Sequence, residues 1–156
     1  MLPEVQQAGS VLLFWSFGSE VQTRPAMELA LAAGKSIALP RIVDGQIEPR
    51  SWRPGDPLEP TGFGAMEPAT GRTLNTSEID VVVTPGVAFD LHGYRIGYGG
   101  GFYDRLFTSL GESATRVGIG FEIQLVEGTL PRGRFDLPIE ILVTQERTIR
   151  FTEEGP

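Results

Sequence analysis

Strand-forming apolar runs alternate with a helix-length segment near the start of the chain, and this alternation constrains the fold more than any other feature. Residues 11–17 (VLLFWSF) and 36–39 have the composition of strands, and the first run is expected to be buried on both faces. Between them, Thr23 and Pro25 form a helix-start signal with Thr23 as the cap, and Gly34 is a helix stop. A strand, a helix and a strand within about 30 residues are typical of a crossover between parallel strands.

The same alternation continues along the chain. We expect Pro40 to end the second strand and residues 79–84 (IDVVVT) to form a central strand. The other expected elements are an exposed strand or hairpin arm at 46–53, a loop at 54–72, a helix at 101–110, and strands at 116–121 and 139–143. The pattern predicts an α/β fold, a largely parallel sheet flanked by helices, as a single domain over residues 1–156.

Composition narrows the possible functions. The chain has no Cys and one His, which excludes thiol catalysis, cysteine-ligated metals and His-rich metal sites. A formal net charge of −7 argues against nucleic-acid or membrane-surface binding. No apolar run approaches the roughly 20 residues of a membrane span, and the N-terminal MLPEVQQAGS lacks the features of a secretory signal. We therefore expect a cytoplasmic protein that binds neither nucleic acid nor a membrane.

Polar residues follow several of the predicted strands. Ligands of open α/β sheets bind outside the carboxyl ends of the strands, so the loops after residues 17, 39, 84 and 121 are expected to form the site. Those loops carry Glu20, Thr23, Arg41, Asp90, Glu122 and Gln124.

The segment 85–105 (PGVAFDLHGYRIGYGGGFYDR) is the densest functional signal, because five glycines fall between Gly93 and Gly101. Glycines let backbone N–H groups approach a phosphate, and the N-terminus of the following helix adds its positive dipole. We expect Arg95 to supply a bidentate phosphate contact and Asp104 to supply a carboxylate for Mg²⁺. The alternative is a tight loop in which Asp104 only complements the helix dipole.

Two common nucleotide motifs are excluded. The dinucleotide fingerprint needs Gly at its sixth place, and counting from Gly97 the sixth residue is Phe102. The Gly34-Lys35-Ser36 tripeptide has Leu29 where the phosphate loop requires Gly, and it lies between a helix and a strand, the reverse of the usual order.

The whole segment from 85 to 107 resembles the signature of the 5-formyltetrahydrofolate cyclo-ligase family, also called methenyltetrahydrofolate synthetases. Further resemblances follow in the family's order between residues 11 and 144. They are Ser19 to Thr23, Ala38 to Arg41, Met66 to Pro68, Gly120 to Leu125, Leu130-Pro131 and Phe135 to Ile139.

The resemblance implies an enzyme that uses ATP and Mg²⁺ to close 5-formyltetrahydrofolate to 5,10-methenyltetrahydrofolate. ATP phosphorylates the formyl oxygen, the neighbouring amine closes the ring, and phosphate leaves. Phosphoryl transfer depends mainly on positioning and charge neutralisation, which suits a chain without Cys.

The resemblance also implies roles for individual residues. The expected catalytic residues are Arg95, Tyr103 and Asp104, and the expected Mg²⁺ ligands are Asp104 and Asp136. The expected ATP contacts are Arg95, Gly97, Tyr98, Gly99, Gly100, Gly101, Phe102 and Tyr103. The expected folate contacts are Trp15, Glu20, Phe102, Tyr103 and Gln124. Core packing for Trp15, a helix-start charge for Glu20 and a structural role for Gln124 are the alternatives, and His92 receives no role.

The chain departs from the family pattern in three places. Its printed sequence begins almost at the first strand, whereas family members open with a basic helix that reaches the ATP phosphates. Glu140 stands where the family's closing motif has a second aspartate, and Gly100 stands where some members carry Lys. These departures leave open a non-catalytic folate- or nucleotide-binding member that has lost the helix. A sugar-phosphate isomerase or acyl-CoA transferase is a weaker alternative that rests on fold analogy alone.

Overall fold

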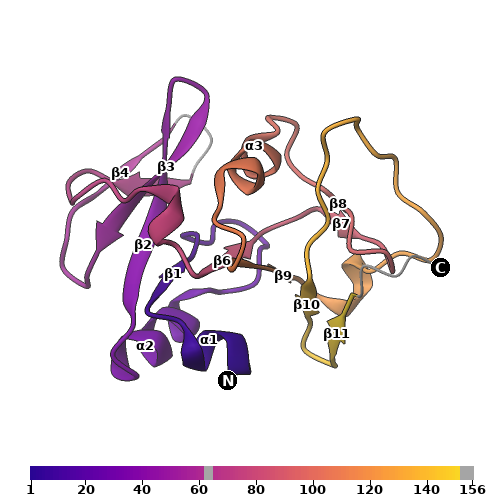
Figure 1. Ribbon diagram of the computed structural model, residues 1–156, viewed down its shortest axis with the longest axis horizontal. Helices are drawn as coiled ribbons and strands as arrows, with labels where there is room; N and C mark the ends of the chain where they lie inside the picture. The colour runs from indigo at the N-terminus through magenta and orange to yellow at the C-terminus, as the bar shows by residue number, and fades with distance from the viewer. Residues whose placement is uncertain (62–64, 152–156) are drawn as a thin grey trace.

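The computed structural model describes residues 1–61 and 65–151, and its centre is a twisted sheet. The strands of that sheet are β1 (Ser10–Leu12), β2 (Ser36–Val43), β3 (Gln46–Trp52), β6 (Val81–Thr84), β9 (Thr115–Ile119), β10 (Ile141–Val143) and β11 (Thr148–Arg150). Among the described residues they lie in the order β11-β10-β9-β6-β1-β2-β3 (Figure 1). The five inner strands pair in parallel, and the antiparallel β2–β3 and β10–β11 pairs close the two sides. The expected α/β class with a largely parallel sheet is confirmed.

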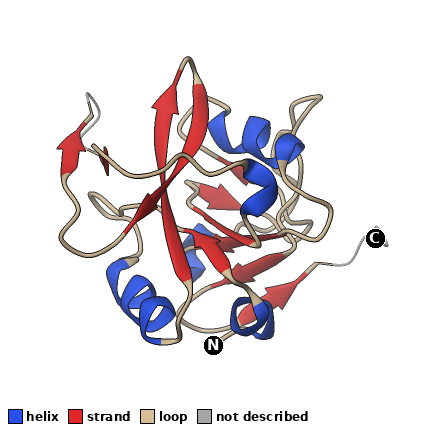
Figure 2. Cartoon of the chain, turned by 60° about the vertical axis from the view of Figure 1, so that its left-hand side comes forward, coloured by secondary structure: helices blue, strands red, loops and turns tan. Residues whose placement is uncertain are grey.

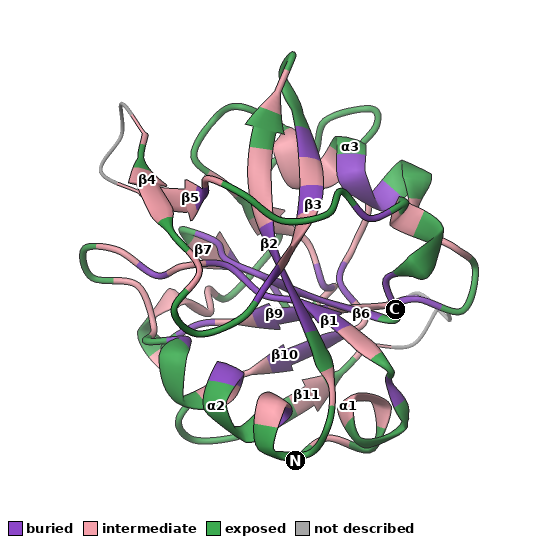
Figure 3. Ribbon diagram, turned by 90° about the vertical axis from the view of Figure 1, so that its left-hand side faces the viewer, coloured by how far each residue is buried: buried purple, intermediate pink, exposed green. Residues whose placement is uncertain are grey.

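Helices cover both faces of this sheet, as Figures 1 and 2 show. The helices are α1 (Pro3–Gln7), α2 (Arg24–Ala32) and α3 (Phe102–Ser109), with short 3₁₀ turns η1 (Thr76–Glu78) and η2 (Glu122–Gln124). On one face, Met27 and Ala30 of α2 pack with Val81 and Val83. On the other, α3 buries Leu106 against a second cluster that contains strand residues of opposite parity. Alternate side chains of each central strand therefore enter different cores, and Figure 3 shows these strands as the most buried part of the chain.

The first strand and the following helix differ from expectation in detail. Strand β1 ends at Leu12, although Leu13 and Phe14 remain buried and the Leu13 N–H still donates a 3.0 Å hydrogen bond to the Ala38 carbonyl of β2. Thr23 occupies the N-cap position of α2, as expected, but the expected capping by its side chain is wrong. Its hydroxyl instead donates a 2.5 Å hydrogen bond to the Phe14 carbonyl, which links the two ends of the intervening loop. Gly34 has φ +81° and ends the helix, as expected.

The expectation that Pro40 ends the second strand is also wrong. Strand β2 continues to Val43, and Pro40 pairs with Pro49 of β3. Pairing of β2 with β1 stops at Ala38. Pro40 therefore lies beyond β1, where the missing N–H of a proline leaves no hydrogen bond of the sheet unmade on that side of β2. The β2–β3 hairpin has an exposed tip and a buried base (Figure 3). Ile47 and Trp52 of β3 are both buried and belong to different cores.

Two small hairpins lie outside the main sheet. Residues 54–72 contain the expected loop and, within it, the antiparallel pair β4 (Leu58–Pro60) and β5 (Met66–Pro68), while residues 62–64 of that loop lie outside the described residues. The pair β7 (Ala88–Phe89) and β8 (Arg95–Ile96) folds the segment after β6 into a second hairpin. The glycine-rich loop connects the end of this hairpin to the start of α3.

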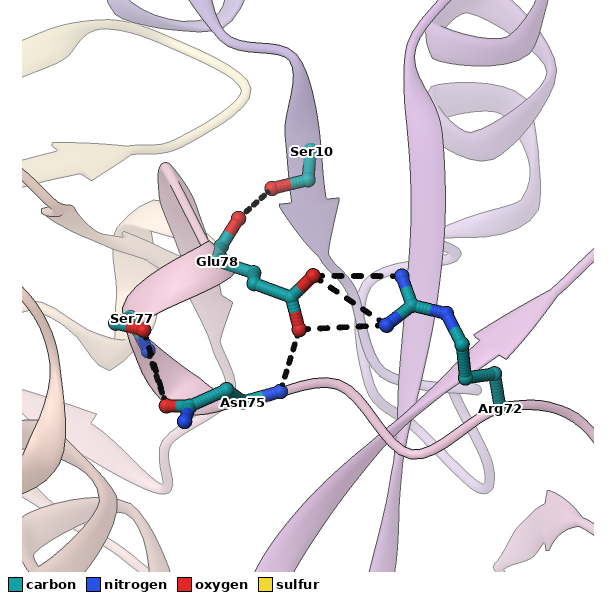
Figure 4. Close-up of polar contacts among 5 residues, drawn as sticks. All are labelled: Ser10, Arg72, Asn75, Ser77 and Glu78. Carbon is teal, nitrogen blue, oxygen red and sulfur yellow. Dashed lines mark hydrogen bonds and ion pairs between the residues drawn. The ribbon is translucent and has the colours of Figure 1, made fainter.

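A polar network closes the amino-terminal edge of the sheet (Figure 4). The Asn75 side chain and Glu78 form a capping box around η1, in which the Asn75 N–H donates a 2.7 Å hydrogen bond to Glu78. The Glu78 carboxylate also pairs with Arg72 at 3.3 Å, and its backbone carbonyl accepts from Ser10 of β1. Asp80 accepts hydrogen bonds from backbone N–H groups at the start of β1. The polar groups at this edge are therefore partnered within the chain.

Candidate active site

The order of the strands changes direction between β1 and β6. The chain leaves β1 toward β2 on one side and later places β6 on the other, so the loops from their carboxyl ends diverge and leave a crevice, which is where ligands of this fold class bind. A pocket of about 220 Å³ lies at this position. Its described lining residues are Phe14, Ser19, Glu20, Val21, Pro85, Gly86, Val87, Tyr98, Ile119 and Gln124. The volume suits a ring system rather than a complete cofactor-sized molecule.

Glu20 is the acidic group of this pocket. One carboxylate oxygen accepts a 2.9 Å hydrogen bond from the Phe17 N–H, and the other accepts from the Tyr98 hydroxyl at 3.2 Å. Partial burial raises the pKa of Glu20, and these two hydrogen bonds oppose that effect. The glycine-rich loop therefore touches the pocket through Tyr98, a contact that joins residues 78 positions apart.

Gln124 lines the pocket but uses its amide on the protein. Its Oε1 accepts a 2.7 Å hydrogen bond from the Phe121 N–H. Its Nε2 donates to the carbonyls of Gly86 and Val87 at 2.8 and 3.2 Å. These contacts give Gln124 the structural role that was its alternative, and its contact with folate stays a prediction.

The glycine-rich loop has the backbone of an anion cradle. Gly99 and Gly101 have φ values of +98° and +65°, in the left-handed region where side chains are strained. Gly101 occupies the N-cap of α3, so among the described residues no side chain caps the free N–H groups of the first turn. The first turn of α3 begins directly after Gly101 and contains Phe102, Tyr103 and Asp104. The glycines that precede it are Gly97, Gly99, Gly100 and Gly101. The arrangement leaves backbone donors and the helix dipole available to an anion.

Arg95 lies beneath this loop. Its Nη1 donates a 3.2 Å hydrogen bond to the Pro85 carbonyl, and its guanidinium stacks 5.3 Å from the centre of the Tyr103 ring. Burial lowers the pKa of Arg95, while the charge of Asp104 opposes that shift. Arg95 Nε and the hydroxyl of Thr84 are buried with no hydrogen-bond partner among the described residues. Unpaired buried donors are unusual, and here both flank the carboxyl end of β6.

Asp104 and Asp136 are brought into electrostatic contact by the fold. Burial raises the pKa of Asp104, the nearby charge of Asp136 raises it further, and Arg95 lowers it. Asp136 sits in a turn where it accepts a 2.6 Å hydrogen bond from the Gly133 N–H. No group of three or more His, Cys, Asp or Glu side chains suited to a metal occurs in the described residues. Two carboxylates nevertheless match Mg²⁺, which usually takes one or two of them together with substrate phosphates and water.

The three aromatic residues predicted to contact folate, Trp15, Phe102 and Tyr103, lie in different parts of the structure. Trp15 is not among the described residues of the pocket lining: it packs edge-on against Trp52 at 5.7 Å and beneath Arg24 at 4.3 Å. Phe102 and Tyr103 pack against the core on the α3 face. Burial raises the pKa of Tyr103, so its phenol stays protonated at neutral pH. The folate contacts of these three aromatic residues stay predictions.

Two features of the site were not predicted from the sequence. Tyr98 appeared only as a contact of the nucleotide loop, whereas its hydroxyl also binds Glu20 in the pocket. Thr84 appeared only as the last residue of a strand. Its position at the carboxyl end of the central strand is the signal that could have found it.

These features define an α/β protein that has a ring-sized pocket at its strand switch point and, next to the pocket, a glycine-rich loop that leads into a helix N-terminus. The family model of the 5-formyltetrahydrofolate cyclo-ligase family matches residues 1–145. The chain therefore belongs to the 5-formyltetrahydrofolate cyclo-ligase family. None of the helices among the described residues combines the length and apolarity needed to cross a membrane.

Individual relatives agree with this assignment. The 5-formyltetrahydrofolate cyclo-ligase of Escherichia coli is 36% identical over 151 residues, which cover 93% of this chain and 82% of that protein. The cyclo-ligase of Haemophilus influenzae is 34% identical, with coverage of 91% and 79%. The solved structure of Aquifex aeolicus 5,10-methenyltetrahydrofolate synthetase superposes with a TM-score of 0.82 at 34% identity, and the match covers 99% of this chain and 77% of that one.

Proposed function

We propose that this chain is an ATP-dependent 5-formyltetrahydrofolate cyclo-ligase that acts in the cytoplasm. It converts 5-formyltetrahydrofolate to 5,10-methenyltetrahydrofolate and releases ADP and phosphate. The observation that carries the proposal is the Tyr98–Glu20 hydrogen bond, because it joins an anion-binding loop to a ring-sized pocket in a member of this family.

In this proposal the glycine-rich loop holds the triphosphate. The backbone N–H groups at Gly99 to Gly101 and the N-terminus of α3 face the phosphates. Arg95 adds a positive charge whose side chain is already stacked and buried. Asp104 and Asp136 would hold Mg²⁺, which neutralises phosphate charge when it is bound.

The pocket at Glu20 orients the folate. The amino and ring N–H groups of the pterin are hydrogen-bond donors that a carboxylate accepts in pairs. Transfer of the γ-phosphoryl group from ATP to the formyl oxygen makes that oxygen a leaving group and yields ADP. The neighbouring amine nitrogen then attacks the formyl carbon, its proton is released, and the C–O bond breaks as phosphate departs.

A folate- or nucleotide-binding member without activity is the competing function. The relatives at 34–36% identity are named as cyclo-ligases, which favours the enzyme. Purified chain, 5-formyltetrahydrofolate and Mg²⁺ should develop the absorbance band of the methenyl product only when ATP is present. Binding of both ligands with no ATP-dependent band would support the binder instead.

A further inference from the structure

Asp90 is a fully buried carboxylate that the proposed chemistry does not use. Its Oδ1 accepts hydrogen bonds from the N–H groups of His92 and Tyr94, at 2.9 and 3.0 Å. Its Oδ2 accepts a 3.0 Å hydrogen bond from the N–H of Leu130, forty residues away along the chain. A buried carboxylate needs such partners to offset its desolvation, and here they come from two separate segments.

The first of these segments leads to the glycine-rich loop. The Asp90 N–H also donates to the Tyr94 carbonyl at 2.9 Å, so residues 90–94 form a tight turn around the carboxylate. Tyr94 directly precedes Arg95, and the cradle begins two residues later. Because these hydrogen bonds fix the backbone of Tyr94, the Asp90 carboxylate also fixes the position at which Arg95 begins.

The second segment, residues 130–139, carries Asp136. It is tied to the turn at both ends, by Leu130 N–H to Asp90 and by a 2.8 Å hydrogen bond from Ile139 N–H to the Gly93 carbonyl. The turn at Gly133–Asp136 lies between these two ties. Arg132 adds a contact of its own, because its guanidinium stacks 3.7 Å from the centre of the Tyr94 ring.

We propose that Asp90 is a positioning residue of the nucleotide site, one that holds the glycine-rich loop and the Asp136 turn at a fixed separation. The proposal rests on the proposed function, because it needs a nucleotide that contacts both segments. Asp90 does not touch that nucleotide. It acts through Tyr94 and Leu130, whose backbone it fixes.

The substitution Asp90→Asn tests the contact between Asp90 and Leu130. An asparagine keeps an oxygen for His92 and Tyr94 but turns its NH₂ toward the Leu130 N–H, so two donors face each other. The matched control is Asp80→Asn. Asp80 also accepts hydrogen bonds from backbone N–H groups, at Gly9 and Ser10, and it lies at the opposite edge of the sheet.

Calorimetric titrations with ATP and with 5-formyltetrahydrofolate, each in Mg²⁺ buffer, measure both affinities on the three proteins. We expect Asp90→Asn to weaken ATP binding about tenfold and to leave folate binding nearly unchanged. Asp80→Asn should leave both affinities nearly unchanged. Equal loss of ATP affinity in the two variants, or equal loss of both ligands in Asp90→Asn, would overturn the proposal.

Amide hydrogen exchange on the unmodified chain gives an independent measurement, which also serves if Asp90→Asn does not fold. The amides of His92, Tyr94 and Leu130 should open together, and ATP should slow their exchange more than that of Gly9 and Ser10. Separate opening of Leu130 would refute the link. If ATP does not bind the unmodified chain, the proposed function fails, whereas intact ATP binding with separate opening refutes only the role of Asp90.

Discussion

The polar network at the amino-terminal edge of the central sheet and the candidate site at its carboxyl-terminal edge differ in how the fold shifts the pKa values of their charged groups. At the amino-terminal edge, the hydrogen bond from the Asn75 N–H and the ion pair with Arg72 lower the pKa of Glu78. At the carboxyl-terminal edge, burial raises the pKa values of Glu20 and Asp104 and lowers that of Arg95. In these three residues the fold disfavours the charged form, whereas Glu122 at the same edge has a pKa that is lowered by its hydrogen bonds with Thr144 and Arg147.

This difference separates groups whose partners lie within the chain from groups that we propose bind a ligand. The partners of Glu78 are present in the chain, so its charge contributes to folding. Glu20, Asp104 and Arg95 are desolvated with incomplete compensation, and Arg95 Nε lacks a partner among the described residues. Clusters of perturbed pKa values of this kind are characteristic of functional sites. Substitutions at the two edges should therefore have opposite consequences.

The largest contrast is expected for Asp104→Asn. Loss of one charge at the proposed Mg²⁺ and phosphate site should lower turnover by roughly 10²–10³-fold, a typical magnitude for an electrostatic contribution to the transition state. The melting temperature should be retained, because the carboxylate is desolvated in the fold. Steady-state rates at varied Mg²⁺, together with thermal melting, measure both quantities. Near-normal turnover at limiting Mg²⁺ would show that Asp104 only complements the helix dipole.

Glu20→Gln should come next and should act on one ligand. A carboxylate that accepts from buried donors contributes about 1.5–3 kcal/mol per charged hydrogen bond, which is roughly a 10- to 100-fold weakening of 5-formyltetrahydrofolate binding. ATP affinity should change far less. Calorimetric titration with each ligand separates the two effects, and Glu78→Gln at the other edge is the control. Equal losses for both ligands would assign Glu20 a purely structural role.

Local sequence patterns predicted the parts of the fold that depend on local preferences. The central strand at 79–84 and the helix at 101–110 correspond to β6 and α3, because a β-branched run and a glycine followed by an amphipathic segment determine them locally. The loop geometry also followed from composition, since left-handed φ values at Gly99 and Gly101 favour glycine.

Long-range contacts account for what local patterns could not predict. Pro40 is compatible with β2 only because β1 no longer pairs there, and sequence does not reveal where a neighbouring strand stops. The hydroxyl of Thr23 has a partner nine residues earlier that competes with capping. Gln124 donates hydrogen bonds to backbone carbonyls 37 and 38 residues away, a structural role that its residue type did not reveal, while its folate contact stays a prediction.

A smaller effect is expected for Asn75→Ala at the amino-terminal edge. Removal of this cap should lower the free energy of unfolding by about 1 kcal/mol, which for a domain of this size is about 2–4 °C in melting temperature. Turnover and both ligand affinities should stay the same at a temperature where the variant is folded. Thermal melting and steady-state kinetics check this, and a selective loss of ATP affinity would contradict the division between the two edges.

The smallest effect, and the most direct test of the comparison, is the pH dependence of stability in Glu78→Gln and Glu20→Gln. The folded-state pKa of Glu78 lies below the ordinary value of 4.5, so its contribution is complete above that value and is lost as pH falls through the lowered pKa. The cost of Glu78→Gln should therefore grow as pH rises. The folded-state pKa of Glu20 lies above 4.5, so stability is lost as pH rises through it and the partly buried carboxylate ionises beside Tyr98. Glu20→Gln should therefore become more favourable, relative to the unmodified chain, over the same range. Urea unfolding at a series of pH values gives both differences, and slopes of the same sign would mean that the two edges do not differ in how they hold charge.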